Sequence, residues 1–80
     1  MINIDELKKK IIYRSSYRGT KEMDIFVSSF VKSIIDSLSI DDLKDLDLLV
    51  NMNDEDISKI SKNEMRFKNK KILKLLIDFK

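Results

Sequence analysis

The feature that most limits the fold is an unbroken helical pattern in the first half of the chain. Between positions 23 and 38, apolar residues recur at spacings of three and four: Met23, Phe26, Val27, Phe30, Val31, Ile34, Ile35 and Leu38. An α-helix turns once every 3.6 residues, so this spacing places all of them on one broad face. The pattern therefore predicts a helix of about four turns at the centre of the domain.

Capping residues and shorter apolar stripes predict four further helices. Asn3, followed three residues later by Glu6, has the form of a capped helix start, and this helix is expected to reach residue 17 or 18 and stop at Gly19. The same reasoning places the starts of the four later helices at Thr20, Ser39, Asn53 and Ser61.

The chain contains no proline and a single glycine, which argues against a turn-rich β fold. Every predicted connection is two to five residues long, and short connections favour antiparallel neighbours. Eighty residues leave no room for a second core. We therefore expect an all-α protein, a compact five-helix bundle of antiparallel helices with short connections, in which residues 1–80 form a single helical domain.

The absence of cysteine and histidine limits the chemistry open to this chain. A zinc site and a Ser–His or Cys–His nucleophile arrangement both require residues that it lacks. The acidic residues between positions 41 and 56 lack the glycine and the bidentate glutamate of an EF-hand loop, so we expect them to face water. No enzyme, no metal site and no stably bound cofactor are predicted.

The charges are distributed in blocks, which leaves an alternative function open. Residues 41–56 contain seven acidic residues and one lysine, whereas residues 59–80 contain eight basic and two acidic residues. A lysine-rich C-terminal helix would suit a small protein-interaction or nucleic-acid-binding helical module. However, Phe67 and Phe79 suit the core better than they suit stacking on bases, so a solvated basic face is the first expectation.

Residues 13–24, with the sequence YRSSYRGTKEMD, contain both tyrosines, two of the three arginines and the only glycine. Arginine and tyrosine are enriched at the hot spots of protein interfaces. A purely structural interpretation stays open beside this one. In it, Gly19 ends a helix in the left-handed conformation, Arg18 caps carbonyls or pairs with Glu22, and Glu22 complements a helix dipole.

This stretch also resembles a known family. The run RGTKEMD, preceded by YRS and followed by a Phe/Val/Ile-rich helix and then DSLS with an acidic helix, is similar to the SdhE (YgfY) flavinylation factors. Their hallmark is an Arg-Gly-x-x-Glu motif between the first two helices of a five-helix bundle. Arg18, Gly19 and Glu22 match this motif, Asp24 matches an acidic residue that commonly follows it, and the similarity covers about residues 7–60.

The resemblance implies an assembly factor that binds the flavoprotein subunit of succinate dehydrogenase, and also of fumarate reductase, and promotes covalent attachment of FAD to it. FAD would then be the client's cofactor, and this chain would act as a monomer. The motif implies client contacts for Arg18 and Glu22 and close backbone approach at Gly19. Together with the neighbours of the motif, the predicted partner-binding residues are Arg14, Tyr17, Arg18, Gly19, Glu22 and Asp24.

The start of the chain carries an expectation about location. No apolar run approaches the ~20 residues of a membrane span. The first residues lack the apolar core of a signal peptide, and Asp5 and Glu6 stand where a transit peptide would be basic. With the bacterial members of the resembled family, this predicts a cytoplasmic, bacterial protein that does not insert into a membrane.

Overall fold

The computed structural model describes residues 3–79, in which five α-helices surround one apolar core. In chain order these are α1 (Ile4–Ser15), α2 (Lys21–Ile34), α3 (Ile40–Val50), α4 (Asp54–Ser61) and α5 (Lys70–Asp78), and a 3-10 helix, η1 (Ile35–Ser37), continues α2. This part of the chain contains no strand. The Cα radius of gyration is 11.6 Å, close to the ~12 Å expected for a compact domain of this length. The predicted all-α five-helix architecture is confirmed.

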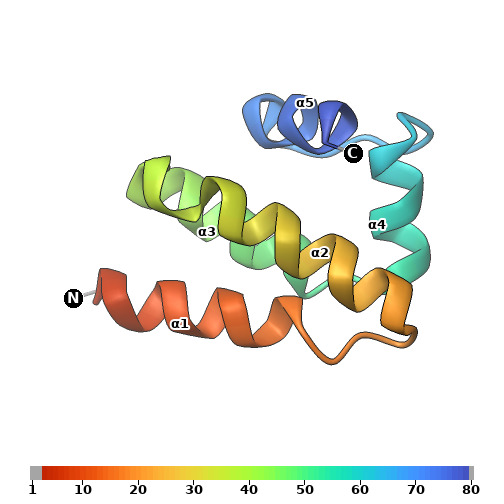
Figure 1. The fold of residues 1–80 in the computed structure, drawn as a ribbon. Coiled ribbons are helices and arrows are strands. Elements are labelled where there is room, and N and C mark those ends of the chain that lie inside the picture. Colours follow the sequence, from red (N-terminus) through yellow and green to blue (C-terminus); the bar gives the residue numbers. More distant parts are fainter. Residues whose placement is uncertain (1–2, 80) are drawn as a thin grey trace.

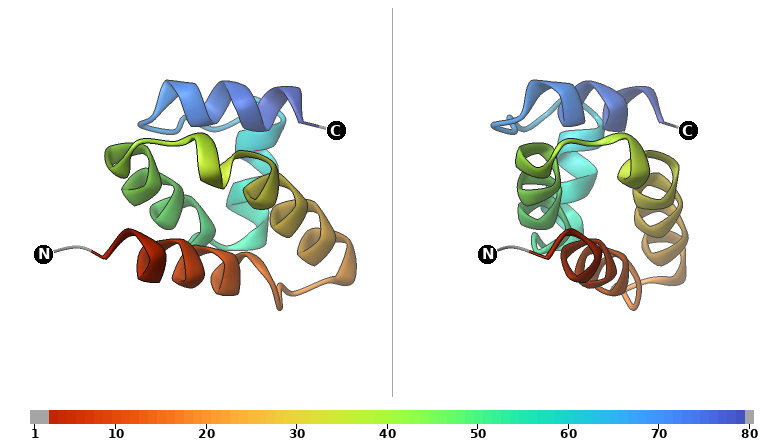
Figure 2. Two further views of the ribbon diagram at one scale, coloured as in Figure 1. Left: turned by 60° about the vertical axis from the view of Figure 1, so that its left-hand side comes forward. Right: turned by 90° about the vertical axis from the view of Figure 1, so that its left-hand side faces the viewer.

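The helices α1, α2 and α3 reverse direction in turn, and α1 packs against both of the others (Figure 1). The short α4 lies crosswise to them and leads the chain to the opposite side of the molecule. There α5 packs against α4, on the side away from α1 (Figure 2). The α1–α2 loop and α5 are therefore on opposite sides of the fold.

The apolar face of α2 contributes more buried residues to the core than α1, α4 or α5 does. Val27, Phe30, Val31 and Ile34 are buried, and Ile35 in η1 continues this face. Burying one such side chain contributes roughly 1.5–3 kcal/mol relative to leaving it exposed. The other helices complete the core with Ile11, Leu43, Leu46, Leu49, Val50, Ile57, Ile60, Ile72 and Leu76.

Four of the predicted helix starts are confirmed by their caps. The side-chain oxygens of Asn3, Thr20, Ser39 and Asn53 each accept a hydrogen bond from the backbone N–H three residues later, at 3.2, 3.1, 3.2 and 2.8 Å. Each bond satisfies one of the N–H groups that a helix start leaves without a partner, and such caps contribute about 1 kcal/mol each.

The predicted start of the fifth helix at Ser61 is wrong, because Ser61 is the last residue of α4. Asn63 has φ 61°, and the N–H groups of Asn63 and Glu64 donate to the carbonyls of Ile60 and Lys59 at 3.0 and 2.8 Å. This pair of bonds around a left-handed residue closes a helix C-terminus. The last helix starts only at Lys70, so its connection (62–69) is longer than the predicted two to five residues.

The expectation that the acidic face of α3 lies in water is also wrong in part. Asn69, which caps α5, donates to Asp42 and Asp45 at 2.8 and 2.9 Å. The Asn69 hydrogen bond is the main reason that the pKa of Asp42 lies below its ordinary value. Ion pairs of 3.3 Å join Lys71 to Asp42, Lys68 to Asp45 and Lys10 to Asp47. Packing of the 62–69 connection and α5 beside α3 brings most of these charges together.

Candidate functional site

The loop between α1 and α2 is held in place by one carboxylate at the start of α4. The Arg18 Nε atom donates to Oδ1 of Asp54 at 2.8 Å, and the Gly19 backbone N–H donates to Oδ2 at 2.8 Å. The Arg18 side chain is 10% exposed and that of Asp54 is 27% exposed. Hydrogen bonds with an ionised partner are stronger than neutral ones, and partial burial limits screening by solvent. We call this arrangement the Asp54 brace.

The Arg18 guanidinium also satisfies carbonyl groups at the ends of two helices. Its Nη1 atom donates to the carbonyl oxygens of Val50 and Arg14, at 2.6 and 3.0 Å, and its Nη2 atom donates to that of Met52. Val50 is the last residue of α3, where carbonyls lack a helical partner. Arg18 therefore caps carbonyls, as the structural interpretation predicted, but its acidic partner is Asp54 and the predicted pairing with Glu22 is wrong.

The prediction that Gly19 ends a helix in the left-handed conformation is wrong. The helix α1 ends at Ser15, before the predicted residue 17 or 18, and Tyr17 adopts the left-handed conformation, with φ 59°. Glycine suits position 19 for a different reason. A Cβ atom at this position would lie 2.9 Å from Oδ2 of Asp54. Glycine therefore allows the backbone to approach Asp54 of the same chain closely.

Tyr17 projects into solvent from this braced loop. Its exposed fraction is 82%, that of Tyr13 is 70%, and the centroids of the two rings lie 5.8 Å apart. A tyrosine in the left-handed region costs about 1–2 kcal/mol, and such strain persists where the surrounding structure imposes it. Arg14, in the last turn of α1, is exposed and donates to the side-chain oxygen of Asn51. The last turn of α1 and the loop after it thus present an exposed aromatic pair.

The acidic residues of the motif lie in the first turn of α2. Glu22 is exposed and, among residues 3–79, its side chain has no hydrogen bond or ion pair, whereas Asp24 is half-buried. Glu22 also borders a shallow groove of about 390 Å³, lined by Ile25, Phe26, Ser29 and Phe79. Ile25 is more than half exposed. The carboxylate of Glu22 and the apolar side chain of Ile25 are therefore available here for contact with a partner.

The structure divides the predicted site residues into two groups. Arg18 and Gly19 are occupied by contacts inside the chain. Tyr13, Tyr17, Glu22 and Ile25 form the exposed part, which we call the corner surface. Sequence reasoning missed Asp54 and Asn51, because an acidic residue in a first helical turn and an asparagine at a helix end are both explained by local capping. No local signal joins them to the motif.

The corner surface contains no group of metal ligands. Within the part of the chain that the structure describes, no three acidic, cysteine or histidine side chains lie close enough together to hold a metal ion. Fold and corner together define a class: a small all-α domain that presents a braced loop with exposed aromatic and acidic side chains.

Comparison with known proteins identifies the family. The family model described as "Flavinator of succinate dehydrogenase" matches residues 9–80, so this chain belongs to that family. Among curated relatives, succinate dehydrogenase assembly factor 2, mitochondrial, of Candida glabrata is 36% identical over 96% of this chain, and its namesake in Dictyostelium discoideum is 39% identical over 68%. The FAD assembly factor SdhE of Acetobacter pasteurianus is 27% identical over 70%.

The chain spans about half the length or less of these relatives: 55%, 38% and 51%, respectively. No solved structure matches it significantly.

The prediction of a cytoplasmic, bacterial protein is wrong as made. Two of these relatives are mitochondrial proteins of a yeast and of Dictyostelium, alongside one from a bacterium. The acidic pair on which the prediction relied, Asp5 and Glu6, lies in the first turn of α1, where negative charge stabilises the helix. These two residues therefore say nothing about targeting. None of the helices within residues 3–79 has the length and apolarity needed to cross a membrane.

Proposed function

We propose that this protein binds the flavoprotein subunit of succinate dehydrogenase and promotes covalent attachment of FAD to that subunit. The family match over residues 9–80 and the names of the relatives support this function over the nucleic-acid-binding alternative. The observation that carries the proposal is the Asp54 brace, which ties the motif loop to α4 while Tyr17 in the loop and Glu22 at the start of α2 stay exposed. Preorganised aromatic and charged side chains are what a protein-binding surface requires.

The proposal assigns different roles to the residues of the motif. Tyr17 and Glu22 contact the client directly, whereas Arg18 and Gly19 are positioning residues that act through Asp54. Arg14 and Asp24 lie at the border of this contact area. The chain contributes binding and orientation, which lower the barrier by holding reacting groups in a productive geometry. FAD and the residue that it modifies belong to the client.

The same proposal includes a chain that acts as a monomer, and it extends to the flavoprotein subunit of fumarate reductase, as the resemblance of the motif implies. The corner surface lies at one loop and the helical turns beside it, so a single copy of the chain presents all of it.

A reconstitution tests this function. The apo flavoprotein subunit from the same organism is mixed with FAD, with and without this protein, and covalent flavin is read as in-gel fluorescence after denaturation. Glu22→Lys and Tyr17→Ala are compared with Glu55→Lys, which makes the same charge change at an exposed position on α4. We expect the wild type and Glu55→Lys to raise covalent flavin and the two corner variants to fail.

Two results would contradict the proposal. If the wild-type protein binds the subunit without changing the amount of covalent flavin, its role is limited to holding the client. If Glu22→Lys is as active as the wild type, the corner surface is not the contact area. Circular dichroism of each variant excludes unfolding as the cause of a loss.

A further inference from the structure

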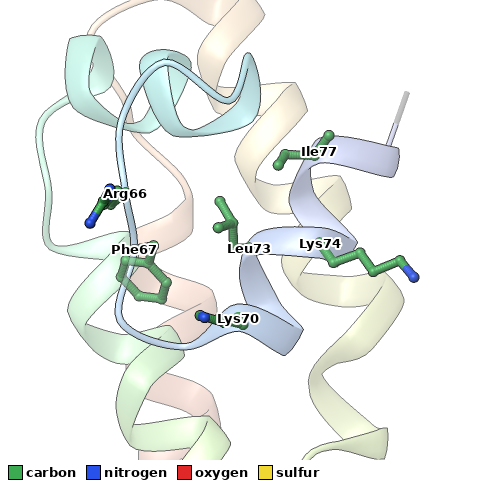
Figure 3. A pocket seen from close by; sticks show the side chains of 6 residues that line it. All are labelled: Arg66, Phe67, Lys70, Leu73, Lys74 and Ile77. Atoms are coloured by element: carbon green, nitrogen blue, oxygen red, sulfur yellow. The ribbon is translucent and has the colours of Figure 1, made fainter.

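A second surface lies on α5, at residues that do not belong to the corner surface. It is a groove of about 460 Å³ between α5 and the connection that precedes it (Figure 3). Lys70, Leu73, Lys74 and Ile77 line it at the spacing of one helical face, and Arg66 and Phe67 complete it. We call it the α5 groove.

The cations of the α5 groove have no acidic partner within residues 3–79. Lys68 and Lys71, their neighbours in sequence, pair with aspartates of α3. Arg66, Lys70 and Lys74 make no ion pair or side-chain hydrogen bond there, and all three are exposed. The acidic face of α3 thus pairs with Lys68 and Lys71 and leaves the positive charge of the groove uncompensated.

The floor of the α5 groove is apolar and supported from below. Phe67 and Leu73 are half-buried and pack against the core, which fixes their positions. Ile77 is half-buried and is not among the described residues that pack against the core. The exposed part of its apolar side chain is therefore open to contact by a ligand. In Figure 3, Lys70 and Lys74 extend from α5 in opposite directions, so positive charge flanks the apolar floor on both sides.

We infer that the α5 groove is a docking site for an acidic amphipathic helix of a partner protein. Such a helix would place apolar side chains on Leu73 and Ile77 and carboxylates beside Arg66, Lys70 and Lys74. The lining from Lys70 to Ile77 is about 10 Å long, which matches two turns of a helix laid along it. Complementary charge on both flanks would orient the helix and speed its association.

Other occupants fit the α5 groove less well. A nucleic acid or a phospholipid headgroup would use the cations but leave the apolar floor without a function. In a second copy of this chain, the apolar face of the acidic helix α3 is buried and Asp42, Asp45 and Asp47 are already paired with lysines. This inference goes beyond the proposed function, since the α5 groove shares no lining residue with the corner surface or with the groove that Glu22 borders.

A titration with a defined probe tests the inference. The probe is a fluorescein-labelled 14-residue peptide with leucines at i, i+3, i+4 and i+7 of a helix and glutamates at the remaining positions. Its matched control is a scrambled peptide of the same composition without an apolar face. We expect the first peptide to shift amide resonances of the ¹⁵N-labelled protein within residues 66–77, and the scrambled peptide to bind much more weakly.

Charge variants assign the binding to the groove. Lys70→Glu combined with Lys74→Glu should weaken the peptide about tenfold, as measured by fluorescence anisotropy, because two attractive contacts become repulsive. Lys9→Glu combined with Lys32→Glu makes the same change in net charge at two exposed lysines on α1 and α2, and should stay within about twofold of the wild type. If the double glutamate variant does not fold, Lys70→Gln with Lys74→Gln replaces it, with a smaller expected loss.

Three results would overturn the inference. The interaction would depend on net charge alone if the scrambled peptide bound as tightly as the amphipathic one. The same conclusion would follow if the Lys9 and Lys32 variant lost as much affinity as the Lys70 and Lys74 variant. Perturbation of residues 66–77 by a single-stranded oligonucleotide or by anionic lipid vesicles, with no effect of the acidic peptide, would make the groove a polyanion site. Ile77→Ser provides an independent check, because it should weaken the peptide several-fold without changing the charge.

Discussion

The Nε atom of Arg18 lies 2.8 Å from Oδ1 of Asp54, although 36 residues separate them in sequence. The neighbouring Gly19 donates its backbone N–H to the other oxygen of the same carboxylate. Arg18 and Gly19, two residues of the Arg-Gly-x-x-Glu motif, thus both bind one acidic side chain that lies outside the motif. The stability of this contact and the geometry of the loop that carries Tyr17 are therefore linked.

Replacing Asp54 by alanine should destabilise the fold. The variant leaves Arg18, which is largely buried, without its charged partner and leaves the Gly19 N–H without an acceptor. We expect a loss of about 2–3 kcal/mol in the free energy of unfolding and a fall in Tm on the order of 10 °C. Urea and thermal unfolding followed by circular dichroism measure both. Glu55→Ala, one residue away and exposed, should change stability by less than about 0.5 kcal/mol; an equal loss there would contradict this explanation.

Gly19→Ala should be destabilising only while Asp54 is present. In the wild type, the added Cβ atom meets Oδ2 of Asp54 at 2.9 Å and disrupts the brace, with an expected loss of about 1 kcal/mol or more. In the Asp54→Ala background the close contact is gone, and alanine should be neutral or stabilise by up to about 1 kcal/mol through the unfolded state. A double-mutant cycle by urea unfolding measures the coupling. Additive effects would show that Asp54 is not the reason for glycine.

Tyr17→Gly should be more stable than Tyr17→Ala, by about 1 kcal/mol, because only glycine adopts the left-handed conformation without a Cβ penalty. This order is the reverse of the one found inside a helix. Both variants remove the exposed ring, so both should lose activity in the flavin attachment assay. Urea unfolding gives the stabilities, and an alanine variant equal to or more stable than the glycine variant would contradict the conformation at residue 17.

Acidification should reveal the contribution of Asp42. The hydrogen bond from Asn69, assisted by Lys71 and Ser39, lowers the pKa of Asp42 below its ordinary value of 3.8. The ionised carboxylate therefore stabilises the folded state above about pH 3.8, and this contribution is lost as the pH falls through the lower folded-state pKa. Urea unfolding between about pH 2 and 5 should show a flatter pH dependence for Asp42→Asn than for the wild type. Asp41→Asn, exposed on the same helix, should keep the wild-type slope.

Local features of the sequence predicted the helices well. The spacing of the apolar residues after Met23 identified the central helix, and four caps were found, from Asn3 to Asn53, because each joins residues only three positions apart. Two boundaries were predicted incorrectly, the end of the first helix and the start of the fifth, and near each lies a left-handed residue that is not glycine, Tyr17 and Asn63 respectively. Nothing in the local sequence distinguishes such a tyrosine from a helical one, since the surrounding packing imposes its conformation.

The sequence by itself determined the helical class, the order of the helices and the position of the motif, since these depend on periodicity and on contacts between near neighbours. Only the tertiary structure decided which partners Arg18 and Gly19 have within the chain. The Arg18–Asp54 contact and the Asn69–Asp45 contact span 36 and 24 residues. Such pairs form only when helices pack against each other. The packing determines which of many residues of the same charge becomes the partner of Arg18 or Asn69. For that reason the carboxylate that explains Gly19 became visible only in the folded chain.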